Sequence, residues 1–198
     1  MSKREKDFFY NLAKKKGVVA RSYFKLEHIQ SKYKILKNGH SVFDIGCAPG
    51  SWLQFASGMI GPTGRLYGID LNDMNVSLPN IIFFKEDIYD FDIKSFYDTH
   101  GLVDTVLSDI APNTTGHKII DVERSFQLCK KSLRIGATLL KPKGNFVCKM
   151  YQGERFDDFH QLMKKAFEKV NIYRPKATRK ISREIFWVGQ NKKDNDAS

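Results

Sequence analysis

The residue with the most unusual surroundings in this sequence is Lys149, which lies in the apolar segment FVCKMYQG. A buried lysine is rare unless a carboxylate pairs with it; the alternative is an edge position from which the amine extends to water. Asp109, in LSDIAPN, is the carboxylate that we expect on a neighbouring strand. Lys25, on an expected helix, and Glu184, at the start of the last expected strand, are further candidates. An amine held among carboxylates at a sheet edge is suited to general acid–base chemistry.

A second group of candidate residues follows the first apolar strand, in the loop DIGCAPGSW (residues 44–52). In open α/β sheets, ligands bind at the carboxyl ends of strands, and Gly46 and Gly50 let the backbone approach a ligand closely. The spacing is not the G-x-G-x-x-G of dinucleotide sites. Pro49 also lacks an amide that a pyrophosphate site would use. A ligand without phosphates is therefore favoured.

Acidic residues at successive strand ends complete this candidate site. Asp44 precedes the loop, and Asp70 ends the next expected strand, twenty residues after Gly50. An acid there accepts hydrogen bonds from ribose hydroxyls, and Asp87, after the third strand, is placed to meet an adenine edge. A single aspartate is more often a helix cap or a solvated turn residue, but three at successive strand ends indicate an S-adenosylmethionine site. Trp52 either lines the cofactor cleft or belongs to the core.

Alternating helices and strands must position these residues. Apolar periodicity predicts helices at residues 5–16, 20–33, 51–60, 91–100, 118–139 and 156–170. Short apolar runs predict strands at residues 41–46, 65–70, 81–87, 104–109, 145–150, 171–175 and 184–190. This alternation is typical of a doubly wound α/β fold, here a mostly parallel seven-stranded sheet with helices on both faces. The last two strands are too close for a helical crossover, so we expect one antiparallel strand.

Composition excludes several classes of protein. The chain has 198 residues, and its three cysteines form no CxxC pair, which excludes a disulfide scaffold and a four-cysteine zinc site. The five histidines are scattered along the chain, so we expect no metal. No apolar run reaches the ~18–20 residues that a membrane span needs, and MSKREKDFF lacks the apolar core of a signal peptide. We expect a soluble intracellular protein, either cytoplasmic or organellar.

The positive charge is concentrated near the two ends of the chain. The formal net charge is +11, and the pI is about 9.5. Residues 1–40 hold eleven Lys and Arg against three acids, and residues 164–193 hold ten against two. Residues 41–163 hold twelve against fifteen. One interpretation is that lysines simply solubilise the ends; the other is a single phosphate-binding face for nucleic acid where the ends meet.

Five segments, in order, resemble those of the FtsJ/RrmJ-like family of ribose 2′-O-methyltransferases: RSYFKLEHI, VFDIGCAPGSWLQ, LSDIAPNTTG, FVCKMYQGE and ATRKISREIFW. The resemblance runs from about Lys6 to Lys192, and it implies a Rossmann-like S-adenosylmethionine-dependent methyltransferase fold. It implies a catalytic tetrad of Lys25, Asp109, Lys149 and Glu184. With Asp44, Gly46 and Pro49 of the loop, the cofactor-binding residues are then Gly50, Trp52, Asp70, Asp87 and Asp109. Cys47 departs from the small residues common in the family.

Methyl transfer from a sulfonium to a ribose 2′-hydroxyl is an in-line displacement that mainly requires alignment. The hydroxyl is weakly acidic, so a general base would help. Lys149 is the expected base, oriented with the ribose by the rest of the tetrad; the alternative is that it steers the hydroxyl lone pair without full proton transfer. The expected phosphate contacts, which position RNA without reading its sequence, are Lys14, Lys15, Lys16, Arg21, Lys176, Arg179, Lys180 and Arg183.

The resemblance favours 2′-O-methylation of ribosomal RNA, of the large subunit and at uridine, within a ribosomal particle. S-adenosylhomocysteine would be the product. Transfer RNA is the main rival substrate, because DFFYNLAKKKG resembles the tRNA branch. Methylation of a messenger-RNA cap is less favoured, because the sequence shows no cap-binding feature. Two rival functions are a non-catalytic RNA-binding or ribosome-assembly factor and a nucleotide-dependent dehydrogenase. We expect a monomer with one methyltransferase domain at residues 1–193, including a basic helical extension at 1–40, and a frayed tail at 194–198.

Overall fold

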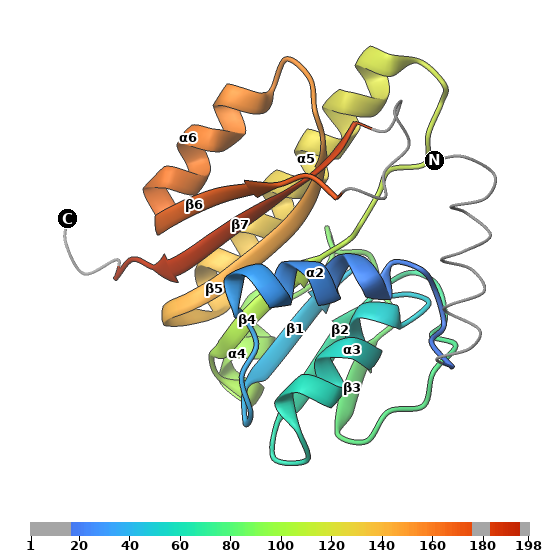
Figure 1. The fold of residues 1–198 in the computed structure, drawn as a ribbon, viewed down its shortest axis with the longest axis vertical. Coiled ribbons are helices and arrows are strands. Elements are labelled where there is room, and N and C mark those ends of the chain that lie inside the picture. The colour runs from blue at the N-terminus through green and yellow to red at the C-terminus, as the bar shows by residue number, and fades with distance from the viewer. Residues whose placement is uncertain (1–16, 176–182, 195–198) are drawn as a thin grey trace.

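The computed structural model describes residues 17–175 and 183–194, and a seven-stranded sheet lies at its centre (Figure 1). The strands are β1 (Ser41–Ile45), β2 (Arg65–Ile69), β3 (Ile81–Phe84), β4 (Val103–Ser108), β5 (Leu140–Tyr151), β6 (Phe167–Tyr173) and β7 (Glu184–Lys192). The helices are α2 (Tyr23–Tyr33), α3 (Ser51–Ile60), α4 (Ile93–His100), α5 (Lys118–Leu139) and α6 (Phe156–Ala166).

The strand order is β3-β2-β1-β4-β5-β7-β6. Neighbours from β3 to β5 pair in parallel, while β7 runs antiparallel to both β5 and β6. This arrangement confirms the predicted doubly wound sheet with one antiparallel strand. Its consequence for function is that the carboxyl ends of β1, β4 and β5 share one edge with the beginning of β7.

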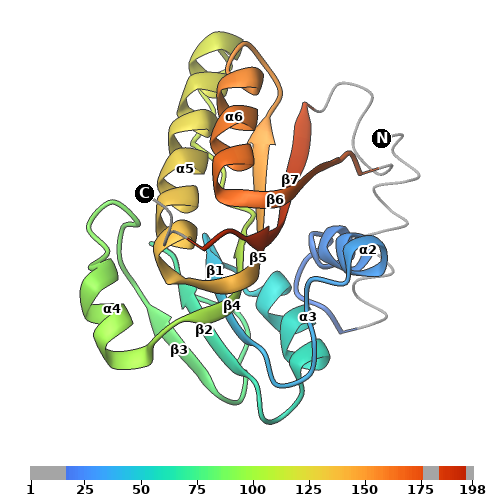
Figure 2. The ribbon, with the colours of Figure 1, turned by 90° about the vertical axis from the view of Figure 1, so that its left-hand side faces the viewer.

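Helices cover both faces of the sheet and bury a separate apolar cluster on each (Figure 2). Alternate residues of a strand point to opposite faces, so Phe43 packs in the cluster under α4, α5 and α6. Its neighbour Val42 packs in the cluster under α2 and α3. The two layers fix the sheet edge at which the candidate residues lie.

The predicted helices at residues 51–60 and 118–139 are confirmed with their bounds, and α2 begins at Tyr23, three residues later than predicted. The observed parallel strands end one to three residues before the predicted ends at β1 to β4. The predicted helix at residues 5–16 lies outside the described residues. None of the described helices has the length and apolarity needed to span a bilayer.

Two boundaries near the end of the chain were predicted wrongly. Residues 167–170, expected to be helical, belong to β6, because the Phe167 ring stacks on that of Phe146 at 5.8 Å and the backbone pairs with β7. Tertiary pairing overrides helix propensity there. The fifth strand begins at Leu140 rather than at residue 145. A register shift near Val103 accommodates Pro142, since proline is tolerated at irregular strand positions.

Candidate functional site

Four ionisable side chains meet at the carboxyl edge of the sheet, and we call them the tetrad: Lys25, Asp109, Lys149 and Glu184. Lys149 Nζ lies 2.9 Å from Asp109 Oδ1 and also donates to the backbone carbonyl of Asp109. Lys25 Nζ lies 2.9 Å from Glu184 Oε2 and 4.0 Å from Asp109 Oδ1. The structure therefore brings together all four predicted catalytic residues, as an alternating chain of cations and carboxylates.

The sheet register explains how two members of the tetrad come together. Asp109 directly follows β4, whose Ser108 pairs with Cys148 of β5. The carboxylate therefore lies next to Lys149, the following residue of β5. Lys149 is only 6% exposed, so its amine does not extend to water as an edge position would require. A buried ammonium is stable only with partners of this kind.

Lys25 reaches the tetrad from α2, which is attached to the start of α3. Trp52 Nε1 donates to the Ser22 carbonyl at 2.9 Å, and the hydroxyls of Ser22 and Ser51 lie 2.6 Å apart. The Lys25 amine also lies 5.4 Å from the centre of the Phe186 ring, within range of a cation–π interaction. Residues next to the candidate cofactor loop therefore determine where this lysine lies.

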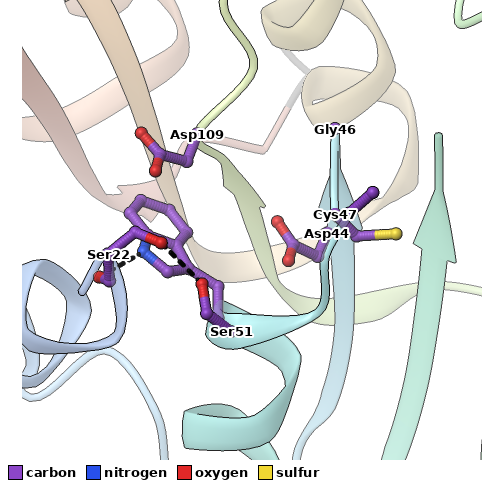
Figure 3. Close-up of a pocket in the computed structure, with 8 residues that line it drawn as sticks. Ser22, Asp44, Gly46, Cys47, Ser51 and Asp109 are labelled. Atoms are coloured by element: carbon purple, nitrogen blue, oxygen red, sulfur yellow. Dashed lines mark hydrogen bonds between the residues drawn. The ribbon is translucent and has the colours of Figure 1, made fainter. Parts of the chain in front are cut away.

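A pocket opens beside the tetrad, between the end of β1 and the beginnings of α2 and α3 (Figure 3). It is lined by Ser22, Asp44, Gly46, Cys47, Ala48, Ser51, Trp52 and Asp109. Trp52 is almost fully buried, as expected of a core residue, and it also lines the pocket; its contact with a cofactor stays a prediction. Ser22 and Ser51 were not among the predicted site residues, because a serine beside a helix is usually interpreted as a cap.

Asp44 is the most unusual group in the pocket. It is 1% exposed, and neither carboxylate oxygen has a hydrogen-bond partner among the described residues. Burial raises the pKa of Asp44 well above its ordinary value, and the negative charges of Asp109 and Asp70 raise it further. Buried polar groups are nearly always satisfied. The carboxylate is therefore available to a ligand, best a cationic hydrogen-bond donor that would lower its pKa again.

The loop around this pocket requires glycine at two positions. Gly46 and Gly50 have φ of 73° and 104°, in the left-handed region. A Cβ on Gly46 would lie 2.6 Å from Ile110 Cβ. The Ala48–Pro49 peptide bond is cis. The loop backbone can thus pass close to the first residues after β4, which keeps the pocket next to Asp109.

Two other predicted cofactor residues, Asp70 and Asp87, accept hydrogen bonds from backbone amides of the neighbouring loops. Asp70 accepts hydrogen bonds from the Ala48 amide at 2.9 Å and the Asn72 amide at 2.8 Å. Asp87 accepts one from the Tyr89 amide at 2.9 Å. Neither of these acids, nor Pro49 or Gly50, is among the residues that line the pocket. The predicted cofactor contacts of Asp70 and Asp87 would lie outside it, after the ends of β2 and β3.

The Cys47 thiol lines the pocket but is unsuited to covalent chemistry. Burial raises its pKa strongly, and the negative charges of Asp44 and Asp70 raise it further. The thiolate is the reactive form of cysteine, so this side chain acts as a small apolar group. Among the described residues, no group of three or more His, Cys, Asp or Glu side chains could hold a metal ion.

Two of the eight predicted RNA contacts fall within the described residues. Arg21 and Arg183 are both exposed and flank the tetrad, one just before α2 and one just before β7. The ion pair of Lys25 with Glu184 brings these two parts of the basic end segments together. The remaining six predicted contacts lie outside the described residues: Lys14, Lys15, Lys16, Lys176, Arg179 and Lys180.

Comparison with known proteins gives concordant matches in sequence and structure. The family model described as FtsJ-like methyltransferase matches residues 18–192. A ribosomal RNA large subunit methyltransferase E of Desulfatibacillum aliphaticivorans is 48% identical over 95% of this chain and 91% of its own. A protein of the same name from Bdellovibrio bacteriovorus is 43% identical over 98% and 100%. Among solved structures, a ribosomal RNA methyltransferase from Plasmodium falciparum superposes with a TM-score of 0.74, at 28% identity over 87% of this chain and 97% of its own.

Proposed function

The chain belongs to the FtsJ-like methyltransferase family, and on this premise we propose that it methylates a ribose 2′-hydroxyl in large-subunit ribosomal RNA. The methyl donor is S-adenosylmethionine, and the target nucleoside is a uridine in a ribosomal particle. The observation that carries the proposal is the buried Lys149 amine, 2.9 Å from Asp109 and beside the pocket that contains Asp44. Residues 1–193 act as one methyltransferase domain, of which the family model matches 18–192.

The residues of the pocket fit this cofactor. The Asp44 carboxylate lacks a partner among the described residues and suits an ammonium group such as the amino group of the methionine part. Asp70 would bind the ribose hydroxyls and Asp87 the adenine edge. Bound S-adenosylmethionine supplies a methyl group on a sulfonium that is its own leaving group, so the protein mainly aligns the reactants.

The tetrad provides the groups that a ribose hydroxyl needs. Lys149 Nζ takes the proton of the 2′-hydroxyl as its oxygen attacks the methyl carbon. Asp109 fixes the position of this amine through its carboxylate and its carbonyl. Lys25, paired with Glu184, orients the ribose. If the same amine kept its proton, it could only direct the lone pair of the hydroxyl. The pH dependence of the rate separates the two roles, because only a base must be deprotonated for activity.

The test is transfer of labelled methyl from S-adenosylmethionine to ribosomal particles, naked ribosomal RNA and transfer RNA in parallel. Wild type should label the particles, and Lys149→Ala should lose at least about 100-fold in rate, the usual contribution of a positioned base. The matched control is Lys94→Ala, which removes an exposed lysine of α4 and should leave the rate unchanged.

Three further outcomes would each contradict a separate part of the proposal. Label only in transfer RNA would keep the chemistry and overturn the substrate. Bound cofactor without label in any RNA would favour a non-catalytic RNA-binding factor. Wild-type rates in Lys149→Ala would remove Lys149 from its role as base.

A further inference from the structure

Tyr151 lies next to Glu184 of the tetrad and takes no part in the chemistry above. Tyr151 is the last residue of β5 and points to the same face as Lys149, because alternate residues of a strand share a face. In the antiparallel pairing with β7, Tyr151 lies opposite Glu184 and Lys149 opposite Phe186. Directly opposite side chains are neighbours. The phenol ring therefore stands beside Glu184, about 7 Å along the strand from Lys149 toward the sheet edge.

The charges around this ring disfavour a phosphate as its ligand. Burial raises the pKa of the Tyr151 phenol, the carboxylates of Glu184, Asp121 and Asp109 raise it further, and Lys25 lowers it. The phenol therefore stays neutral at pH 7. The carboxylates outnumber the Lys25 cation around this ring, so the position suits a neutral aromatic group better than a phosphodiester.

The first turn of α5 adds apolar side chains to the same edge. Farther along α5, Ser125 accepts a hydrogen bond from the Tyr151 amide at 3.0 Å, which places the helix against the end of β5. Ile119 lies one turn before the buried Val122, yet it is 75% exposed, and Ile120 is 45% exposed. The reason is that α5 extends beyond the end of the sheet (Figure 1). These two isoleucines therefore add apolar surface to the part of α5 that lies beyond the sheet.

We propose that the Tyr151 ring is the surface on which the nucleobase of the methylated nucleotide stacks. The inference rests on the proposed function and names the part of the RNA that enters the site. Base stacking on aromatic side chains tolerates any base and is a main source of affinity for single-stranded nucleic acid. If a base stacks on Tyr151, its ribose can point toward Lys149, two residues earlier on β5. Its phosphates would then lie away from the carboxylates.

The first test compares three variants with wild type in RNA methylation, S-adenosylmethionine binding and thermal unfolding. Tyr151→Ala should lower kcat/KM for RNA by about 10- to 100-fold, the range expected for loss of one stacked base. Tyr151→Phe keeps the ring and should remain within about two-fold of wild type. Tyr97→Ala removes an exposed tyrosine of α4 and should behave as wild type. Cofactor affinity should be unchanged in all three.

The second test pairs Tyr151→Ala with an RNA that lacks the base at the nucleotide that wild type methylates. If the ring stacks on that base, the abasic RNA lowers wild-type kcat/KM and removes the difference between wild type and Tyr151→Ala. Equal activity of Tyr151→Ala and wild type on intact RNA would overturn the inference. So would a Tyr151→Phe loss as large as that of Tyr151→Ala, because the hydroxyl would then be the important group. If wild type methylates no RNA, the proposed function itself fails.

Discussion

At the residue scale, the site holds two buried ionisable side chains in opposite situations. Lys149 has a carboxylate at 2.9 Å and a carbonyl as partners, so its amine is satisfied within the protein. Asp44 is equally buried but has no hydrogen-bond partner among the described residues. An unsatisfied buried group costs about 1–3 kcal/mol. The protein without cofactor therefore carries a stability cost at Asp44 that a cationic ligand would relieve.

We predict that Asp44→Asn stabilises the ligand-free protein and weakens S-adenosylmethionine binding. Asparagine removes the buried acid at nearly constant volume, and its amide carries no charge for the ammonium group to pair with. We expect Tm to rise by about 2–4 °C for each kcal/mol gained. Calorimetric titration should show at least about ten-fold weaker cofactor binding, the usual range for charged hydrogen bonds. Asp90→Asn, at an exposed aspartate, is the control for a lost surface charge.

The stability gain of Asp44→Asn should depend on pH in one direction. Because the pKa of Asp44 is raised on folding, the folded state binds more protons than the unfolded state above the unfolded pKa of about 3.9. Wild-type stability at this group therefore falls as pH rises from about 4 toward the folded pKa. Asp44→Asn should raise Tm more at pH 7 than at pH 5. A gain that grows on acidification would contradict the assignment.

At the element scale, apolar periodicity predicted the helices well, but it did not predict the contacts between elements that hold the site residues in place. The spacing in SWLQFASGMI is sufficient to define α3, and apolar runs are sufficient to place Asp44 near the end of β1 and Asp109 directly after β4. The β6 boundary was wrong because pairing with β7 decides it, and that pairing is not local. The burial of Asp44 and the attachment of α2 to α3 could not be predicted from the sequence either. Both depend on contacts between elements that no local pattern encodes.

We predict that the attachment of α2 to α3 affects catalysis through Lys25. Trp52→Phe keeps an aromatic ring against Phe186 but removes the hydrogen bond to the Ser22 carbonyl. It should cost about 0.5–1.5 kcal/mol for the lost bond and lower methyl transfer several-fold as α2 loosens. Urea unfolding and steady-state rates measure the two effects.

A matched control is available at the second tryptophan. Trp187 is fully buried, and its Nε1 has no hydrogen-bond partner among the described residues. Trp187→Phe therefore loses ring volume but no hydrogen bond, and methyl transfer should stay near wild type. If both variants lose activity equally, the effect is one of packing, and the hydrogen bond to α2 has no catalytic importance.

At the scale of the whole molecule, described parts of both basic end segments meet at the edge of the sheet that holds the tetrad. Residues 1–40 and 164–193 each carry a net charge of +8, and the acids of the other segments reduce the total to +11. The Lys25–Glu184 pair joins the described parts of these two segments at the tetrad. Arg21, just before α2, and Arg183, just before β7, are both exposed. The carboxylates near Tyr151 occupy the same edge. The proposed division is that phosphates bind at the flanks, while the base and ribose enter between them.

This division predicts a particular salt dependence. The logarithm of the RNA association constant should fall linearly with the logarithm of the salt concentration. For single-stranded RNA the slope is about −0.7 per phosphate contact. Arg21→Ala and Arg183→Ala should each weaken binding and reduce the slope by about 0.7, whereas Lys94→Ala on α4 should leave the slope unchanged. Tyr151→Ala should weaken binding with the wild-type slope, because stacking releases no counterions. Filter binding at several salt concentrations distinguishes the two classes. Unchanged slopes in both arginine variants would show that the flanks of the tetrad do not bind phosphate.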